Sequence, residues 1–297
     1  MIRYERFSKS FDRIRAVDSF SLTVERGEVV ALLGPNGSGK TTTLKAAAGL
    51  LKPTSGAVSI GGRPASEPAA RHVISFLPQK VSFPDSLTGR EVVEFYRRLR
   101  NLEAARTDDA LRFASLNGAS NRALSTYSGG MLQRLGLAVA VLPDAEVMLL
   151  DEPTAALDPA GLSLFYDLAE RRRGEGKAVL FTSHQLGDVE RLADRFAIIV
   201  DGKLVALMTA PELSGELASR GAMRLTLDRE AGLLLPKVLV LSPHASAVGN
   251  EIVIPGSAQM RAQVIDIVRE SNATIQSLTT EEGRLDMMYR ELVARCE

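Results

Sequence analysis

A glycine-rich loop between an apolar run and a helix is the first feature of the sequence that could do chemistry. It follows Val29–Leu33 and fits the pattern G-x-x-x-x-G-K-[ST] over Gly34, Pro35, Asn36, Gly37, Ser38, Gly39, Lys40, Thr41 and Thr42. Such glycines let backbone N–H groups converge on phosphate oxygens, and the helix N-terminus adds positive partial charge. We expect the Lys40 ammonium to neutralise the β- and γ-phosphates of a nucleotide and the Thr41 hydroxyl to ligate Mg²⁺. A glycine-rich turn could match by accident, but the flanking strand and helix favour a phosphate site.

Two carboxylates, Asp151 and Glu152, directly follow the apolar run Val147–Leu150. Open α/β sheets gather their ligands at the carboxyl ends of the strands. We expect Asp151 to hold the Mg²⁺ shell, directly or through water, and Glu152 to orient or deprotonate an attacking water. Acidic residues often end a strand without any catalytic role, and it is the phosphate loop upstream that favours catalysis here.

A second anion-binding nest is predicted at Ser128, Gly129 and Gly130, which precede an apolar helix over Leu132–Val141. A serine and two glycines at a helix start present backbone N–H groups to an anion. A plain helix cap explains the serine equally well.

The elements that must position these residues alternate between strands and helices from Ile2 to about Ser219, which is typical of a largely parallel sheet. Four runs indicate strands buried on both faces: Val29–Leu33, Val147–Leu150, Ala178–Phe181 and Phe196–Val200. Helical spacing replaces the strand pattern over Thr88–Asn101 and Asp108–Leu116. The sequence therefore predicts an α/β domain over residues 1–219, with a helical subdomain at about residues 84–142.

A small α+β domain is predicted over residues 220–297. Strand patterns recur at Met223–Leu227, Glu251–Ile254 and Thr274–Leu278, with helices near Ser257–Glu270 and from about Glu281. Regulation, a dimer contact and simple packing all remain open as roles for this domain.

Composition excludes several classes of protein. Lys and Arg number 36 and are balanced by 36 Asp and Glu, so no bulk charge would draw the chain onto nucleic acid or an anionic membrane. The single cysteine, Cys296, has no internal disulfide partner, which favours a reducing compartment. The longest apolar run, near residues 135–142, is far below the ~18 residues that span a bilayer. We expect a cytosolic start and no membrane span.

The order of these motifs resembles the nucleotide-binding subunit of ATP-binding-cassette (ABC) transporters. The resemblance covers about residues 2–219 and rests on the phosphate loop, Gln79, Ser128-Gly129-Gly130, Asp151-Glu152-Pro153-Thr154, Ala156-Leu157-Asp158 and His184. It implies a P-loop NTPase cassette fold, ATP and Mg²⁺ as cofactors, and ATP hydrolysis coupled to transport. Tyr127 and Met131 depart from the Leu and Gln that the family usually carries beside Ser-Gly-Gly.

The resemblance also implies roles for residues that would otherwise have plain explanations. Phe11 matches the aromatic ring that stacks on adenine, although a core ring is the ordinary reading. Gln79 matches the glutamine that meets Mg²⁺ and the attacking water, where a lone glutamine would be a solvated loop residue. His184 resembles the switch histidine that contacts the γ-phosphate, and Asp158 the residue that joins two nucleotide sites across a dimer.

Partners follow from the same resemblance. Two ATP molecules are sandwiched head to tail between two cassettes, so a homodimer or a pair with a close homologue is expected. A membrane permease is expected to contact residues 81–94, which would hold the chain at the cytoplasmic face of the cell membrane. A surface helix there could equally pack only within its subdomain.

The motifs around Asp85–Glu91 and Thr126–Leu137 are most similar to multidrug-type and Nos-type export ATPases, and the Nos-type is favoured. Nos-type ATPases serve copper-centre maturation of nitrous oxide reductase in denitrification, with a permease and a periplasmic partner. The alternatives are a multidrug or ABC-2-type exporter ATPase, a soluble non-transport ABC ATPase, and a non-hydrolysing regulator. The last would lack a usable Glu152 or His184.

Overall fold

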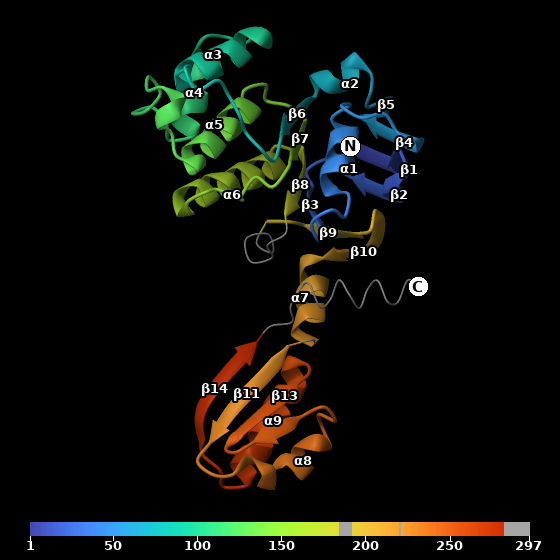
Figure 1. Ribbon diagram of the computed structural model, residues 1–297, viewed down its shortest axis with the longest axis vertical. Helices are drawn as coiled ribbons and strands as arrows, with labels where there is room; N and C mark the ends of the chain where they lie inside the picture. The colour runs from blue at the N-terminus through green and yellow to red at the C-terminus, as the bar shows by residue number, and fades with distance from the viewer. Residues whose placement is uncertain (184–191, 220, 282–297) are drawn as a thin grey trace. The chain divides into compact units, whose positions relative to one another are not determined.

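The computed structural model describes residues 1–183, 192–219 and 221–281. The chain divides into two compact units, Met1–Thr209 and Ala210–Glu297. Figure 1 shows the elements of each unit. Helix α7 (Ala210–Ser219) therefore groups with the second unit, although the sequence analysis placed the boundary after it, at about residue 219. The division into a nucleotide-binding domain and an accessory domain stays a prediction.

A six-stranded sheet with the order β10-β9-β3-β8-β7-β6 forms the centre of the first unit (Figure 1). Its strands are β3 (Val29–Leu33), β6 (Ile74–Leu77), β7 (Val147–Leu150), β8 (Ala178–Ser183), β9 (Arg195–Val200) and β10 (Lys203–Thr209). All neighbours are parallel except β10, which pairs antiparallel with β9. Every residue of β3, β7 and β8 is buried, because both faces of the sheet are covered. The four predicted strands are its central ones, and the predicted P-loop α/β fold is confirmed.

An antiparallel sheet in the same unit was not predicted from the sequence. Its order is β2-β1-β4-β5, with β1 (Ile2–Phe11), β2 (Ile14–Val24), β4 (Ser55–Ile60) and β5 (Arg63–Pro64). Helix α1 (Lys40–Ala47) contacts β2 and β4 of this sheet and β7 and β8 of the central sheet. Tyr4 on β1 fixes the helix further, since its buried hydroxyl donates to the Thr43 carbonyl at 3.0 Å. The two sheets thus hold α1, and with it the phosphate loop.

Helices replace strands between β6 and β7, as the sequence predicts. The helices of this unit after α1 are α2 (Pro68–His72), α3 (Gly89–Leu99), α4 (Ala105–Phe113), α5 (Gly129–Val141) and α6 (Pro159–Gly174). Figure 1 shows α3, α4 and α5 grouped beside β6. Thr88 and Glu91 form a capping box at the start of α3. Phe165 of α6 packs edge-on against Phe181 of β8, with ring centroids 5.5 Å apart, and so covers a face of the central sheet.

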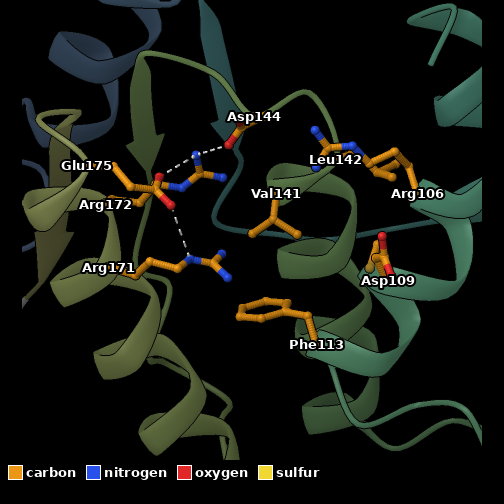
Figure 2. A pocket seen from close by; sticks show the side chains of 10 residues that line it. Arg106, Asp109, Phe113, Val141, Leu142, Asp144, Arg171, Arg172 and Glu175 are labelled. Atoms are coloured by element: carbon orange, nitrogen blue, oxygen red, sulfur yellow. Dashed lines mark hydrogen bonds and ion pairs between the residues drawn. The ribbon is translucent and has the colours of Figure 1, made fainter. Parts of the chain in front are cut away.

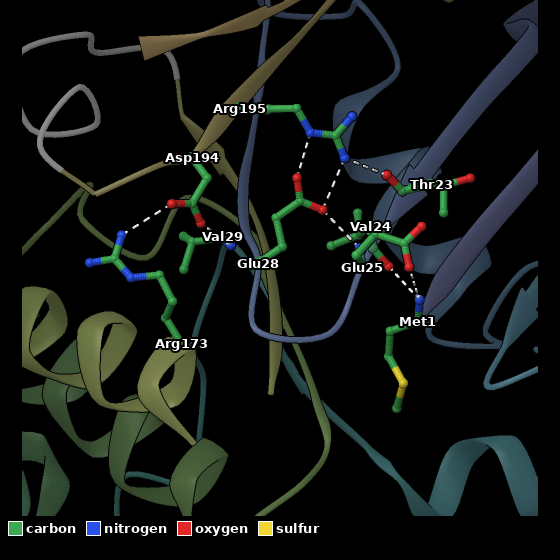
Figure 3. A network of polar contacts seen from close by, with 9 residues as sticks. All are labelled: Met1, Thr23, Val24, Glu25, Glu28, Val29, Arg173, Asp194 and Arg195. Atoms are coloured by element: carbon green, nitrogen blue, oxygen red, sulfur yellow. Dashed lines mark hydrogen bonds and ion pairs between the residues drawn. The ribbon is translucent and has the colours of Figure 1, made fainter. Parts of the chain in front are cut away.

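Charged side chains tie together the amino ends of β3 and β9 (Figure 3). The Glu28 carboxylate pairs with the Arg195 guanidinium, whose Nη2 also donates to the Thr23 carbonyl at 2.8 Å. Asp194 accepts the backbone N–H of Val29 at 2.8 Å. These contacts lie at the opposite end of the strands from the phosphate loop, so we interpret them as structural.

After α7, the second unit has the strand and helix order β-α-β-β-α-β. Its elements after α7 are β11 (Ala222–Leu227), α8 (Leu235–Leu239), β12 (Ser246–Val248), β13 (Glu251–Pro255), α9 (Ala258–Glu270) and β14 (Ile275–Glu281). The strands form one antiparallel sheet with the order β12-β13-β11-β14. Three predicted strands and the helix capped by Ser257 are present, and α8 and β12 were missed. The helix predicted from about Glu281 lies outside the described residues.

No helix among residues 1–183, 192–219 and 221–281 is long and apolar enough to cross a membrane.

Candidate functional site

The phosphate loop connects the end of β3 to the first residue of α1. Gly39 stands directly before α1 with φ +103°, and an added Cβ there would lie 2.5 Å from the Ala16 carbonyl oxygen. Only glycine therefore fits where the loop passes β2. Lys40, Thr41 and Thr42 form the first turn of the helix, so their backbone N–H groups lie at its positive end.

The Lys40 side chain folds over the loop that precedes it. Its Nζ donates to the carbonyl of Gly34 at 2.8 Å and to that of Pro35 at 2.9 Å. Burial lowers the pKa of the Lys40 ammonium, and the opposing charges of Glu152 and Asp151 offset only part of this effect. A buried cation in this place is a partner for an anionic ligand.

The turn between β9 and β10 braces the loop from the other side. Gly202 donates its N–H to the Ser38 carbonyl at 3.0 Å and accepts the Asp18 N–H at 2.8 Å. These two hydrogen bonds of Gly202 link the loop to β2, and the sequence analysis did not predict them. The Asp201-Gly202 pair indicates a tight turn, but nothing local to it says what the turn would touch.

The two predicted carboxylates lie at the end of β7 and are nearly buried, with 1% of Asp151 and 7% of Glu152 exposed. Thr182 of β8 holds both: its hydroxyl donates to Asp151 Oδ1 at 2.8 Å and accepts the Glu152 N–H at 2.8 Å. Glu152 has φ +48°, which turns the chain away from the strand direction at this residue. The sequence analysis assigned no role to Thr182.

One pocket of about 290 Å³ brings many of the predicted residues together. It is lined by Ala16, Asn36, Gly37, Gly39, Lys40, Thr41, Thr42, Gln79 and Glu152. Gln79 comes from the loop after β6, and Glu152 from the end of β7. The pocket therefore joins the cationic loop to a carboxamide and a carboxylate that lie far away in the sequence. Ala16 is the lining residue that the sequence analysis missed.

The residues of the second predicted nest lie elsewhere and do not line this pocket. Ser128 caps α5, accepting the Met131 N–H at 3.2 Å. An added Cβ on Gly130 would lie 3.0 Å from the Ala156 carbonyl oxygen, so the start of α5 lies against the segment after Glu152. Asp158 caps α6 by accepting the Gly161 N–H at 2.8 Å. These contacts agree with the cap interpretation and leave the ligand role of these residues as a prediction.

Phe11, another predicted residue, is not among the described residues that line the pocket. Phe11 ends β1 with 44% of its surface exposed, and the Lys9 ammonium lies 5.0 Å from its ring centroid. It is thus not the core ring that a plain reading expects. His184 lies outside the described residues.

The oxygen atoms near the pocket fit a small divalent cation. Asp151 Oδ2 and Ser38 Oγ are buried and have no hydrogen-bond partner among the described residues. Within the described ranges, no group of three or more His, Cys, Asp and Glu side chains could form a complete metal cage. Mg²⁺ is usually held by one or two protein oxygens together with phosphates and water, so this sparse set fits Mg²⁺.

The parallel sheet, the phosphate loop and the acidic strand end together define a P-loop nucleoside triphosphatase. Residues 17–155 match the family described as ABC transporter. DrrA3 of Streptomyces coeruleorubidus, a daunorubicin resistance ATP-binding protein, is 32% identical over 296 residues, covering 96% of this chain and 93% of DrrA3. The chain therefore belongs to the ATP-binding proteins of ABC transporters, and it is an ATPase.

Two other known proteins resemble it. LnrL of Bacillus subtilis, a linearmycin resistance ATP-binding protein, is 28% identical and is covered over 99% of both chains. The solved dimer of the ATP-binding cassette MJ0796 with ADP and Pi is 26% identical, with a TM-score of 0.65, over 71% of this chain and 99% of that one. Both relatives named for resistance match the second unit as well as the first, whereas the cassette structure covers a smaller share of this chain.

Proposed function

We propose that the chain is the ATP-hydrolysing subunit of an exporter of the multidrug or ABC-2 type. The observation that carries this proposal is the pocket in which Lys40, Gln79 and Glu152 line one cavity. DrrA3 and LnrL match nearly the whole chain, and their names, which refer to drug resistance, support the assignment to this class of exporter.

Each residue of the pocket has a distinct task in this proposal. The phosphate loop from Gly34 to Thr42 binds the phosphates of ATP through backbone N–H groups, and Lys40 neutralises their charge. Glu152 orients and deprotonates the attacking water, Gln79 positions that water, and His184 contacts the γ-phosphate. Phe11 stacks on the adenine from the exposed end of β1.

Thr41, Gln79 and Asp151 hold Mg²⁺ in the same proposal. The unpartnered Asp151 Oδ2 supports this assignment, since a buried carboxylate oxygen without a donor is a costly arrangement. When bound, Mg²⁺ supplies positive charge that stabilises the phosphate oxygens during hydrolysis.

A second cassette completes the site. Ser128, Gly129 and Gly130 lie outside the pocket of their own chain, so we assign them to the nucleotide held by a partner. ATP then closes a head-to-tail homodimer, with Asp158 between the two sites, and hydrolysis releases it. The solved MJ0796 cassette is dimeric, which supports this arrangement.

The permease contact is proposed at residues 81–94, on the cytoplasmic face of the membrane. Residues 81–88 contain no helix, and α3 begins at Gly89. Phe83 packs against Tyr96 with ring centroids 6.2 Å apart, so part of this segment packs within its own subdomain. Glu91 is exposed and Arg90 is partly exposed, although Glu91 caps α3 with Thr88 and Arg90 pairs with Asp108 at 2.8 Å.

We prefer the export of drug-like molecules, as the proposed function, to the Nos-type function that the sequence favours. DrrA3 and LnrL carry names from daunorubicin and linearmycin resistance, and neither name supports copper-site maturation or denitrification. A periplasmic partner remains part of the Nos-type hypothesis alone. The same names favour a transport ATPase over a soluble non-transport one.

The Glu152→Gln variant tests the proposed chemistry. It should bind ATP and accumulate as a closed dimer, while steady-state hydrolysis falls by about 10²-fold or more, because the general base is lost. Glu170→Gln, which removes an exposed carboxylate from α6, is the matched control and should hydrolyse ATP normally. Normal turnover by Glu152→Gln would remove Glu152 from the mechanism. Co-purification of the wild-type chain from membranes with a permease tests the transport role, and recovery without any permease would count against it.

A further inference from the structure

A second pocket lies between the helical subdomain and α6, away from the phosphate loop (Figure 2). Its volume is about 260 Å³, and α4, the end of α5 and α6 provide most of its wall. The lining residues are Arg106, Asp109, Ala110, Phe113, Val141, Leu142, Asp144, Arg171, Arg172 and Glu175. The proposed ATPase mechanism uses none of them.

Arg172 is the most unusual residue of this pocket. Only 2% of its surface is exposed, and its Nη1 donates to Asp144 at 2.5 Å. Its Nε is buried and has no hydrogen-bond partner within the described part of the chain. Figure 2 shows the guanidinium extending from α6 toward the pocket, with Arg106 on the opposite wall. A buried cation with an unused donor is costly unless an anion can reach it.

The carboxylates that line the pocket are already paired with cations. Asp144 accepts from Lys177 at 2.7 Å as well as from Arg172. Glu175 lies 3.1 Å from the Lys177 ammonium. The pKa of Asp144 is held below its usual value, since these two cations outweigh the effect of burial, so its carboxylate is charged. The third carboxylate, Asp109, pairs with Arg112 at 3.1 Å.

Positive charge is therefore in excess around the pocket. Among the described residues, five cations face three carboxylates: Arg106, Arg112, Arg171, Arg172 and Lys177 against Asp109, Asp144 and Glu175. The Arg106 side chain makes no hydrogen bond or ion pair within the described ranges. The Arg171 guanidinium lies 5.8 Å from the Phe113 ring centroid, and its Nε lies 3.9 Å from the Glu175 carboxylate. Because Glu175 is shared by Lys177, Arg172 and Arg171, the cations exceed the carboxylates by two, and Arg106 has no described carboxylate within ion-pair distance.

We propose that this pocket between α4 and α6 binds a phosphate-type dianion through Arg106, Arg171 and Arg172. Guanidinium groups suit phosphate because their N–H donors form paired, charge-assisted bonds to its oxygens. The pocket is smaller than the ~300–1,000 Å³ that drug-sized ligands occupy, which favours inorganic phosphate or a compact phosphate monoester. A phosphate monoester in a lipid headgroup presents the same chemistry. The bound anion would join α4 of the helical subdomain to α6.

Calorimetric titration with inorganic phosphate tests the site in the full chain. The phosphate loop is first filled with Mg²⁺ and a non-hydrolysable ATP analogue, so that it cannot take up the added phosphate. We expect binding of one phosphate per chain, and a loss of affinity of about tenfold or more in Arg106→Ala and Arg171→Ala, because each removes a charge-assisted bond. Both residues are exposed or partly exposed, so these variants should fold.

Arg63→Ala is the matched control, since it removes the same charge from an exposed strand residue of the same unit. It should bind phosphate as the wild type does. Equal affinity of wild type and Arg106→Ala for phosphate would overturn the proposal, because the binding would then lie elsewhere.

Vesicle sedimentation distinguishes a lipid headgroup from free phosphate as the source of the anion. Phosphatidylcholine vesicles with and without phosphatidic acid are compared for wild type, Arg106→Ala and Arg63→Ala. Sedimentation that requires phosphatidic acid and is lost only in Arg106→Ala supports the site and assigns it to a headgroup. Calorimetric binding without sedimentation supports the site and assigns it to soluble phosphates. Absence of both would overturn the proposal.

Discussion

The hydroxyl of Thr182 donates to the carboxylate of Asp151 across the gap between β8 and β7, at 2.8 Å. Because the same oxygen accepts the Glu152 N–H at 2.8 Å, one side chain orients both acidic residues. Thr182 is fully buried, so no water can take over either bond without a rearrangement. The acidic end of β7 is thus placed by its neighbouring strand as well as by its own backbone.

Thr182→Val should therefore reduce ATP turnover while the chain still folds. Valine fills the same space but leaves the Glu152 N–H without an acceptor, at a cost of about 1–3 kcal/mol. We expect kcat to fall by about tenfold or more, since about 1.4 kcal/mol corresponds to tenfold in rate. Thr182→Ser keeps the hydroxyl and should retain most activity. Wild-type kcat in the valine variant would show that Thr182 does not position Glu152.

Lys40→Ala should weaken nucleotide binding. The alanine removes a buried cation from the phosphate pocket and the two bonds that close the loop onto Gly34 and Pro35. Hydrogen bonds to charged groups contribute about 1.5–3 kcal/mol, so affinity should drop by at least about tenfold. Equilibrium titration with a fluorescent ATP analogue measures this, with Lys45→Ala in the last turn of α1 as the control. Unchanged affinity would contradict the phosphate-loop assignment.

Gly202→Ala should destabilise the phosphate loop, because Gly202, in the turn between β9 and β10, is hydrogen-bonded to Ser38 of that loop. Gly202 has φ +80°, and an added Cβ would lie 2.9 Å from the Ala16 carbonyl oxygen. We expect a loss of about 1–3 kcal/mol from backbone strain, with a further loss from this collision. Gly176→Ala is the control, because Gly176 has φ +72° and no atom within 4 Å of an added Cβ. Thermal unfolding of both variants separates strain from collision, and equal melting temperatures would rule out a special role for Gly202.

The sequence was sufficient for the elements with strong local patterns. Val29–Leu33 and Val147–Leu150 are continuous apolar runs, which are typical of either buried strands or buried helices. The phosphate loop favoured strands, because such a loop connects a strand to a helix. The first antiparallel sheet was missed because β1 and β2 mix charged and apolar residues along their length. Tertiary contacts with β4 and α1 stabilise these strands more than local propensity does.

The sequence predicted most of the residues that line the pocket, but it did not predict which residues they contact. A motif places Lys40 and Glu152 at the ends of strands, but it does not give the register of those strands. The parallel pairing of Leu150 with Phe181 sets Thr182 beside Asp151, and this register arises from packing between segments about 30 residues apart. The hydrogen bonds of Gly202 with Ser38 and Asp18 could not be predicted for the same reason.

The ion pair between Glu28 and Arg195 should make the stability of the first unit depend on pH in the acidic range. Burial alone would raise the pKa of the Glu28 carboxyl, but the bonds from Arg195 and the Glu25 N–H hold that pKa below the ordinary range of a glutamate. A lowered pKa means that the folded state favours the carboxylate, so the stabilisation is complete above about pH 4.5 and is lost as the pH falls through the folded-state pKa.

Glu28→Gln removes this titration and should lower the free energy of unfolding by about 1 kcal/mol at neutral pH, because the pair is only partly shielded from solvent. Urea unfolding of the full chain, repeated from neutral pH down through the acidic range, measures the difference from wild type. That difference should shrink as the pH falls, since wild type then loses the same charge. Glu25→Gln, at a mostly exposed carboxylate of the same network, should show a smaller effect at every pH. A difference that stays constant with pH would mean that Glu28 acts through packing and not through its charge.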